Sequence, residues 1–105
     1  MIAPNAPPDA RGGGPRDTCR AEVTIVNRRG LHARAAAKFV KVAEQFVADV
    51  EVLKDDMVVC GTSIMGLMVL AAALGSQLEI RARGREARAA VAALVALVER
   101  GFDET

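Results

Sequence analysis

Aromatic residues, histidine and cysteine are all scarce in this chain. Of its 105 residues only 3% are aromatic, with no Trp or Tyr, and there are one histidine and two cysteines. Proteins that bind single-stranded nucleic acid stack bases on aromatic rings, so this composition counts against that class. One histidine and two cysteines cannot supply the four ligands of a Cys/His zinc site, and we expect neither a metal nor a cofactor. Cys19 and Cys60 are predicted to be reduced thiols, one in a terminal tail and one packed in a strand.

An excess of charge of one sign is also lacking, as is any long apolar run. Lys and Arg total 14 against 13 Asp and Glu, which leaves a net charge of +1 and no electrostatic reason to expect nucleic acid as a partner. The apolar stretch 64–74 is interrupted by Gly66 and is shorter than the roughly 20 residues of a membrane span. No charged segment followed by an apolar one opens the chain, as a secretion signal would. We therefore expect no membrane insertion and a cytoplasmic location.

The first 20 residues differ from the rest in composition. They contain all four prolines of the chain and three consecutive glycines. Such a segment has little apolar surface to bury, so residues 1–20 are predicted to be a disordered extension. Residues 21–105 are predicted to form one folded domain.

From residue 21 onward the hydrophobic periodicity alternates between strand-like and helical. The predicted elements follow the order β-α-β-β-α-β-α, over residues 21–26, 33–46, 48–54, 57–60, 63–74, 78–83 and 85–100. Gly75 and Gly101 are expected to end the last two helices. The helix between the first two strands makes them parallel, and the fourth strand fits antiparallel in the gap between them. This pattern predicts an α+β fold, an open-faced β-sandwich whose helices cover one face of a four-stranded antiparallel sheet.

The only histidine, His32, lies just before the first predicted helix, in the stretch NRRGLHARAAAKFV. The first amides of a helix lack intrahelical partners and carry partial positive charge, which makes this position suitable for phosphate. Arg34 adds a guanidinium whose planar donors fit phosphate oxygens, and Ala33 leaves the helix start uncluttered. A neutral imidazole can attack a phosphoryl group and later leave, which suits reversible transfer. These groups are enough for a carrier but not for a hydrolase, and a simple capping or surface histidine is the alternative.

Two segments of the chain resemble the HPr family, the histidine phosphocarriers of the bacterial phosphoenolpyruvate:sugar phosphotransferase system. Residues 27–40 resemble its active-site signature, and residues 62–84 resemble its regulatory-serine segment, so that the resemblance spans about residues 21–104. It implies a sheet with strand order 1-4-2-3. It also implies phosphorylation of His32 on Nδ1, with Arg34 and the adjoining Ala33 backbone at the phosphate.

This chain differs from the family pattern at one position of the active-site signature, and it has the family's regulatory serine. The family commonly has proline directly after the active-site arginine, where this chain has Ala35. Because proline presets φ in the first helical turn, we expect more fraying there and altered transfer kinetics. Ser63 matches the serine that a dedicated kinase/phosphorylase modifies in many of these bacteria. Its alternative role is that of a plain N-cap of the following helix.

The second predicted helix is apolar nearly all round, so part of it is expected to be exposed. The resemblance places this apolar surface beside His32 as a docking site for partners, formed by Ala33, Ala37, Lys41, Ile64, Met65 and Met68. The implied partners of this monomeric carrier are enzyme I, EIIA-type domains and an HPr kinase/phosphorylase.

Three alternative functions are weighed against that of a sugar phosphocarrier. A nitrogen-type regulatory phosphocarrier would use the same chemistry as a signal. An HPr-like regulatory module would bind partners without being phosphorylated, although the intact His32 counts against it. A small RNA-binding domain is disfavoured by the missing aromatic residues and the balanced charge.

Overall fold

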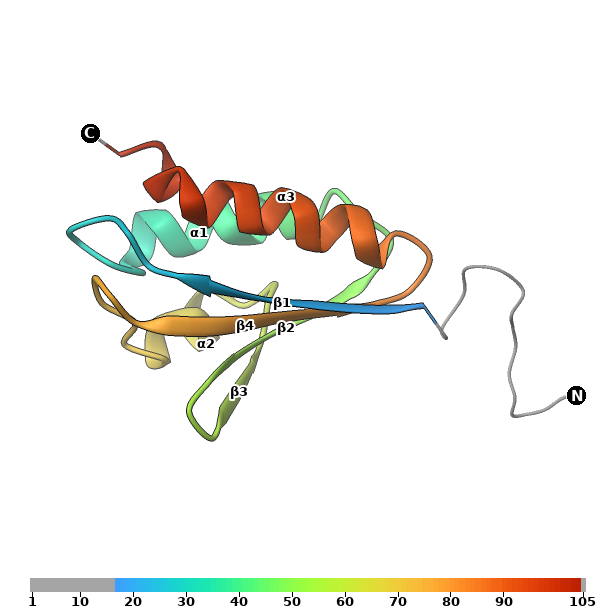
Figure 1. Ribbon diagram of the computed structural model, residues 1–105, viewed down its shortest axis with the longest axis horizontal. Coiled ribbons are helices and arrows are strands. Elements are labelled where there is room, and N and C mark those ends of the chain that lie inside the picture. The colour runs from blue at the N-terminus through green and yellow to red at the C-terminus, as the bar shows by residue number, and fades with distance from the viewer. Residues whose placement is uncertain (1–16, 105) are drawn as a thin grey trace, which may run out of the picture.

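The computed structural model describes residues 17–104 as a four-stranded sheet with helices packed on it (Figure 1). The strands are β1 (Thr18–Thr24), β2 (Asp49–Lys54), β3 (Met57–Cys60) and β4 (Gln77–Arg83). The helices are α1 (Ala33–Ala43), α2 (Ile64–Val69) and α3 (Ala87–Glu99), followed by a short 3₁₀ helix, η2 (Gly101–Asp103). The strand order is β1-β4-β2-β3 with every neighbouring pair antiparallel, which confirms the predicted open-faced fold. No helix in this described part of the chain has the length and apolar character needed to cross a bilayer.

The alternation of side chains along β4 separates a buried face of the sheet from an open one. Leu78, Ile80 and Ala82 are buried, as the sequence predicts for a half-buried strand. The residues between them face the other side, where the Arg81 guanidinium donates to the Glu79 carboxylate at 2.6 Å. The helices therefore pack against one face, and charged side chains line the other.

The helices α1 and α3 lie side by side over the buried face of the sheet (Figure 1). Each presents an apolar stripe that fits the predicted helical periodicity. The buried residues of α1 are Ala35, Ala36, Phe39, Val40 and Ala43, and those of α3 are Ala87, Ala90, Val91, Leu94, Leu97 and Val98. Full burial of a large apolar side chain such as Phe39 stabilises the fold by roughly 1.5–3 kcal/mol. The third helix, α2, contacts α1 and β3.

The first strand begins earlier than the sequence predicts. Thr18 pairs with Arg83 of β4, so residues 18–20 belong to the sheet and not to the extension predicted over 1–20. Cys19 is accordingly a half-buried strand residue, and Cys60 is exposed at the end of β3; both are free thiols. The prediction for residues 1–16 falls outside the described residues.

The second helix is shorter than the predicted 63–74, because contacts with other parts of the chain end it. After Val69 the chain leaves the helix, and Ala71 has a positive φ of 51°. The Ala72 carbonyl then accepts from the Leu31 amide at 2.9 Å, and Gly75 donates to the Ile25 carbonyl at 2.8 Å. The segment 70–76 therefore docks beside the loop that follows β1 and does not continue the helix.

Candidate functional site

The loop before α1 is held against the segment 70–76. Gly30 has φ +68°, and a Cβ atom at this position would lie 2.4 Å from the Ala72 carbonyl oxygen. Leu31 is buried, and its amide donates to that same oxygen. Only glycine allows both the left-handed backbone and this close approach. The position of the next residue, His32, is thus set by the loop on one side and the helix on the other.

His32 is the N-cap residue of α1. Its backbone is extended, with φ −76° and ψ 178°, and its carbonyl accepts from the Ala36 amide at 2.8 Å. Its Nδ1 accepts from the Arg34 amide at 3.2 Å. The ring therefore satisfies one of the free amides at the helix start, where the positive end of the helix dipole lies.

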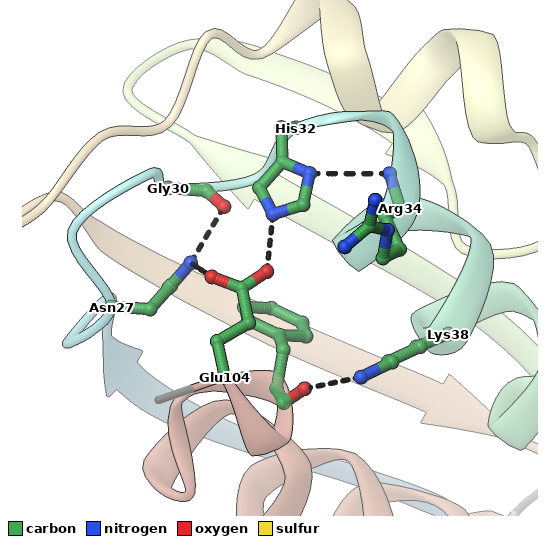
Figure 2. Close-up of polar contacts among 7 residues, drawn as sticks. Asn27, Gly30, His32, Arg34, Lys38 and Glu104 are labelled. Atoms are coloured by element: carbon green, nitrogen blue, oxygen red, sulfur yellow. Dashed lines mark hydrogen bonds and ion pairs between the residues drawn. The ribbon is translucent and has the colours of Figure 1, made fainter.

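The other ring nitrogen of His32 faces a carboxylate from the C-terminal end of the described chain. Figure 2 shows Nε2 directed at Glu104, whose Oε2 atom is its hydrogen-bond partner. Glu104 Oε1 accepts from Asn27 Nδ2 at 3.0 Å, and the same amide donates to the Gly30 carbonyl at 2.9 Å. This network assigns the proton of the neutral imidazole to Nε2 and a lone pair to Nδ1.

The C-terminal segment that carries Glu104 is anchored to the core and to α1. Phe102 is fully buried, and its carbonyl accepts from Lys38 Nζ at 2.7 Å. Gly101 and Phe102 both have positive φ, +67° and 57°, so the chain turns sharply after α3. This turn brings Glu104 back to the start of α1.

The environment favours the charged form of Glu104. The hydrogen bond from His32 is the main cause that lowers the pKa of the Glu104 carboxyl, while partial burial opposes it. The hydrogen bond from Asn27 and the positive charge of Arg29 lower that pKa further. The side chains of His32 and Glu104 are each only 18% exposed, which shields their contact from water.

Arg34 extends from the first turn of α1 beside the imidazole (Figure 2). Its side chain is exposed and has no ion-pair partner among residues 17–104. The guanidinium donors are therefore available to an anion that approaches Nδ1. The described residues contain no group of three or more His, Cys, Asp or Glu placed to hold a metal ion.

Ser63 is the N-cap of α2, which confirms the capping role predicted for it from the sequence. Its Oγ accepts from the Gly66 amide at 2.9 Å, and its backbone is extended with φ −115°.

The residues predicted to form a docking surface are all exposed. Of the apolar ones on α2, Met65 is 76%, Met68 43% and Ile64 40% exposed, and the helix contacts α1. The α1 residues of the surface are Ala33, Ala37 and Lys41. Two further apolar side chains, Val69 of α2 and Leu74 of the segment 70–76, are also exposed.

Sequence reasoning missed Glu104, Asn27 and Lys38. Glu104 is 72 residues from His32 along the chain, and no local pattern links them. One signal was available for Asn27. It is a polar residue directly after the apolar run of the first strand, and a polar side chain at such a position commonly has a specific hydrogen-bond partner.

The chain is similar to phosphocarrier proteins over most of its length. The family model described as "PTS HPr component phosphorylation site" matches residues 19–100. The phosphocarrier protein HPr of Pseudomonas putida is 49% identical over 84 residues, which cover 79% of this chain and 93% of that protein. The phosphocarrier protein NPr of Shewanella violacea is 37% identical over 83 residues, covering 79% and 91%. The crystal structure of HPr-C-His from Thermoanaerobacter tengcongensis superposes with a TM-score of 0.79 at 39% identity, covering 83% of this chain and 98% of that one.

Proposed function

The chain belongs to the HPr family, the phosphocarrier proteins of the phosphotransferase system, and from this premise we propose that His32 carries the phosphoryl group. It receives the group from a phosphohistidine of enzyme I and passes it to a histidine of an EIIA-type domain. The observation that carries the proposal is the position of Nδ1, which has its lone pair at the N-terminus of α1. Beside it lies the Arg34 guanidinium, which has no ion-pair partner in the part of the chain that the structure describes.

The transfer needs one bond to form and one to break. The Nδ1 lone pair of His32 attacks phosphorus, and the nitrogen–phosphorus bond of the donor breaks with its electron pair returning to the donor histidine. The Arg34 amide, which donates to Nδ1 in the resting state, then faces a phosphoryl oxygen. The Arg34 guanidinium and the helix dipole stabilise the charge on the other oxygens, which is the main requirement of phosphoryl transfer.

The docking surface defined above serves both partners in turn. It includes small and flexible apolar side chains, Met65 and Met68 among them, which suits binding to more than one protein. Phosphorylation of Ser63 by an HPr kinase/phosphorylase would place about two negative charges beside these side chains and weaken docking. The protein acts in this scheme as a cytoplasmic monomer.

A nitrogen-type regulatory branch is a second candidate, supported by the similarity to the Shewanella violacea NPr. The chemistry at His32 would be the same, and the two candidates differ in which EIIA-type domain accepts the group. Competition between sugar-type and nitrogen-type EIIA domains for the phosphorylated protein distinguishes them.

The decisive experiment is phosphorylation by phosphoenolpyruvate and enzyme I. We expect an acid-labile phosphate on the protein, and because the chain has a single histidine, a phosphohistidine signal in ³¹P NMR identifies His32. The His32→Ala variant should fold normally and take up no phosphate, while Ser63→Ala should be labelled like the unmodified protein. Labelling retained in His32→Ala would place the site elsewhere, and no labelling of the unmodified protein would favour a regulatory binding module.

A further inference from the structure

We propose that Glu104 is a positioning residue for this transfer, and that its carboxylate keeps the Nε2 proton of His32 in place before, during and after phosphorylation. The proposal deepens the function assigned above and rests on it. It concerns the end of the chain, which no sequence signal connects with the histidine.

Three separate segments of the chain meet at the contact between His32 and Glu104. His32 lies at the start of α1, Asn27 in the loop after β1, and Glu104 after η2 (Figure 2). Each oxygen of the Glu104 carboxylate has its own donor, Nε2 of His32 for one and Nδ2 of Asn27 for the other. A carboxylate held by two donors from different segments has a defined orientation, and so does the ring bonded to it.

Asn27 has a side chain that burial and two hydrogen bonds hold in one orientation. It is only 7% exposed, and its amide donates to both Glu104 and the Gly30 carbonyl. Both of these partners accept hydrogen bonds, so the side-chain amide cannot be turned over without losing both bonds. The Glu104 carboxylate is therefore tied directly to the loop that leads into His32.

The charged side chains around His32 show which group can balance a positive charge on its ring. Arg34 and Lys38 come from α1 and Arg29 from the preceding loop, so the nearby side chains of these elements are cationic. The segment 64–75, which includes α2, contains no charged residue. Asp103, the neighbouring carboxylate, is paired with Arg100 at 2.8 Å. Among residues 17–104, Glu104 is the only residue whose carboxylate contacts the His32 ring.

The chemistry gives this carboxylate two roles. Before transfer, it accepts from Nε2–H and leaves the lone pair on Nδ1, the atom that attacks. When Nδ1 bonds to phosphorus while Nε2 keeps its proton, the imidazole ring becomes positively charged. The carboxylate then stabilises that cation, and no proton enters or leaves during either transfer.

The first test uses the unphosphorylated protein, so its outcome is independent of the proposed function. The ¹³C signal of the Glu104 carboxyl is followed as a function of pH in the unmodified protein and in His32→Ala. Loss of the imidazole hydrogen bond should raise the Glu104 pKa toward its ordinary value. An unchanged titration would mean that the contact does not form in solution, and it would overturn the proposal even if His32 is phosphorylated.

The second test compares Glu104→Gln with Asp103→Asn in the phosphorylated state. Glutamine keeps the size of the side chain and removes the charge, and Asp103→Asn removes the adjacent charge that is paired with Arg100 instead. The pH midpoint of the ³¹P titration of the phosphoprotein should fall by about one unit in Glu104→Gln, since an opposite charge in contact shifts a titration by about that much or more. It should remain unchanged in Asp103→Asn.

The kinetic test separates positioning from docking. Glu104 lies outside the docking surface, so Glu104→Gln should leave the KM for enzyme I unchanged. It should lower kcat by about tenfold, because a shift of one unit in the ³¹P midpoint corresponds to the same free energy as a tenfold change in rate. An unchanged kcat together with an unchanged ³¹P midpoint would overturn the proposal. If no variant and no unmodified protein is labelled at all, it is the phosphocarrier function that fails, and the carboxyl titration still reports on the contact.

Discussion

The substitution Gly30→Ala provides a quantitative test of how the His32 loop is held. Gly30 and Gly101 have nearly the same φ, +68° and +67°, in the left-handed region. A Cβ at Gly101 would meet its nearest atom, Cβ of Asn27, at 3.5 Å, which is an ordinary contact. A Cβ at Gly30 would lie 2.4 Å from the Ala72 oxygen and 2.9 Å from the Ala73 Cα, and both are backbone atoms that cannot move independently. Gly101→Ala is thus a control for the left-handed backbone alone.

The expected magnitudes follow from these contacts. Left-handed backbone costs an L-residue about 1–2 kcal/mol, and loss of glycine freedom in the unfolded chain returns about 0.4–1 kcal/mol. We therefore expect Gly101→Ala to lower the free energy of unfolding by about 0–1.6 kcal/mol. In Gly30→Ala the clash also forces apart the Leu31 amide and the Ala72 carbonyl, and a buried donor left without a partner costs a further ~1–3 kcal/mol. The total for Gly30→Ala is then about 3 kcal/mol.

Urea unfolding followed by far-UV circular dichroism measures both variants, since the chain has no Trp or Tyr to serve as a fluorescent probe. A difference of about 2 kcal/mol between them corresponds to a gap of about 8–16 °C in Tm for a domain of this size. Phosphoryl acceptance should fall in Gly30→Ala because the loop that leads into His32 must shift. Equal losses of stability in the two variants would refute the argument that the segment 70–76 holds this loop.

Further predictions concern the cap, the docking surface and the acid stability of the protein. Ser63→Ala should lower the free energy of unfolding by about 1 kcal/mol in urea titrations, because it removes the cap of α2. Ser63→Asp should keep the cap but slow transfer from enzyme I, and an unchanged rate would leave Ser63 with a capping role only. Met65→Lys should change stability by less than about 0.5 kcal/mol at this 76% exposed position, yet raise the KM for enzyme I; an unaltered KM would remove Met65 from the interface. The lowered pKa of Glu104 means that this residue stabilises the fold above the pH where an unfolded glutamate titrates, and that the contribution is lost as the pH falls through the lowered value. The unfolding free energy of Glu104→Gln should therefore depend less on pH in that range, and an equal dependence would contradict the assignment.

Much of the fold could be predicted because its signals are local. The alternation in β4 and the stripes of α1 and α3 each arise within a few residues, and the structure confirms them. The position of His32 at the helix start was also predictable, because the turn and the alanine-rich run are contiguous with it.

The features that could not be predicted depend on partners distant in sequence. The apolar run 63–74 is compatible with a long helix, and its early end follows from hydrogen bonds to Ile25 and Leu31. Pairing with Arg83 extends β1 back to Thr18, which composition alone assigns to the extension. The contact between Glu104 and His32 depends on the turn after α3, where buried Phe102 has a positive φ.

The location of Glu104 has a consequence for how this carrier is handled. The sheet and the helices α1 to α3 all end before residue 101, so the imidazole depends on a carboxylate that lies outside the main elements of the fold. Removal of Glu104 with the buried Phe102 left in place would keep the architecture intact, while the ring would lose its carboxylate partner. Recombinant versions of this protein are therefore best left unaltered around Glu104.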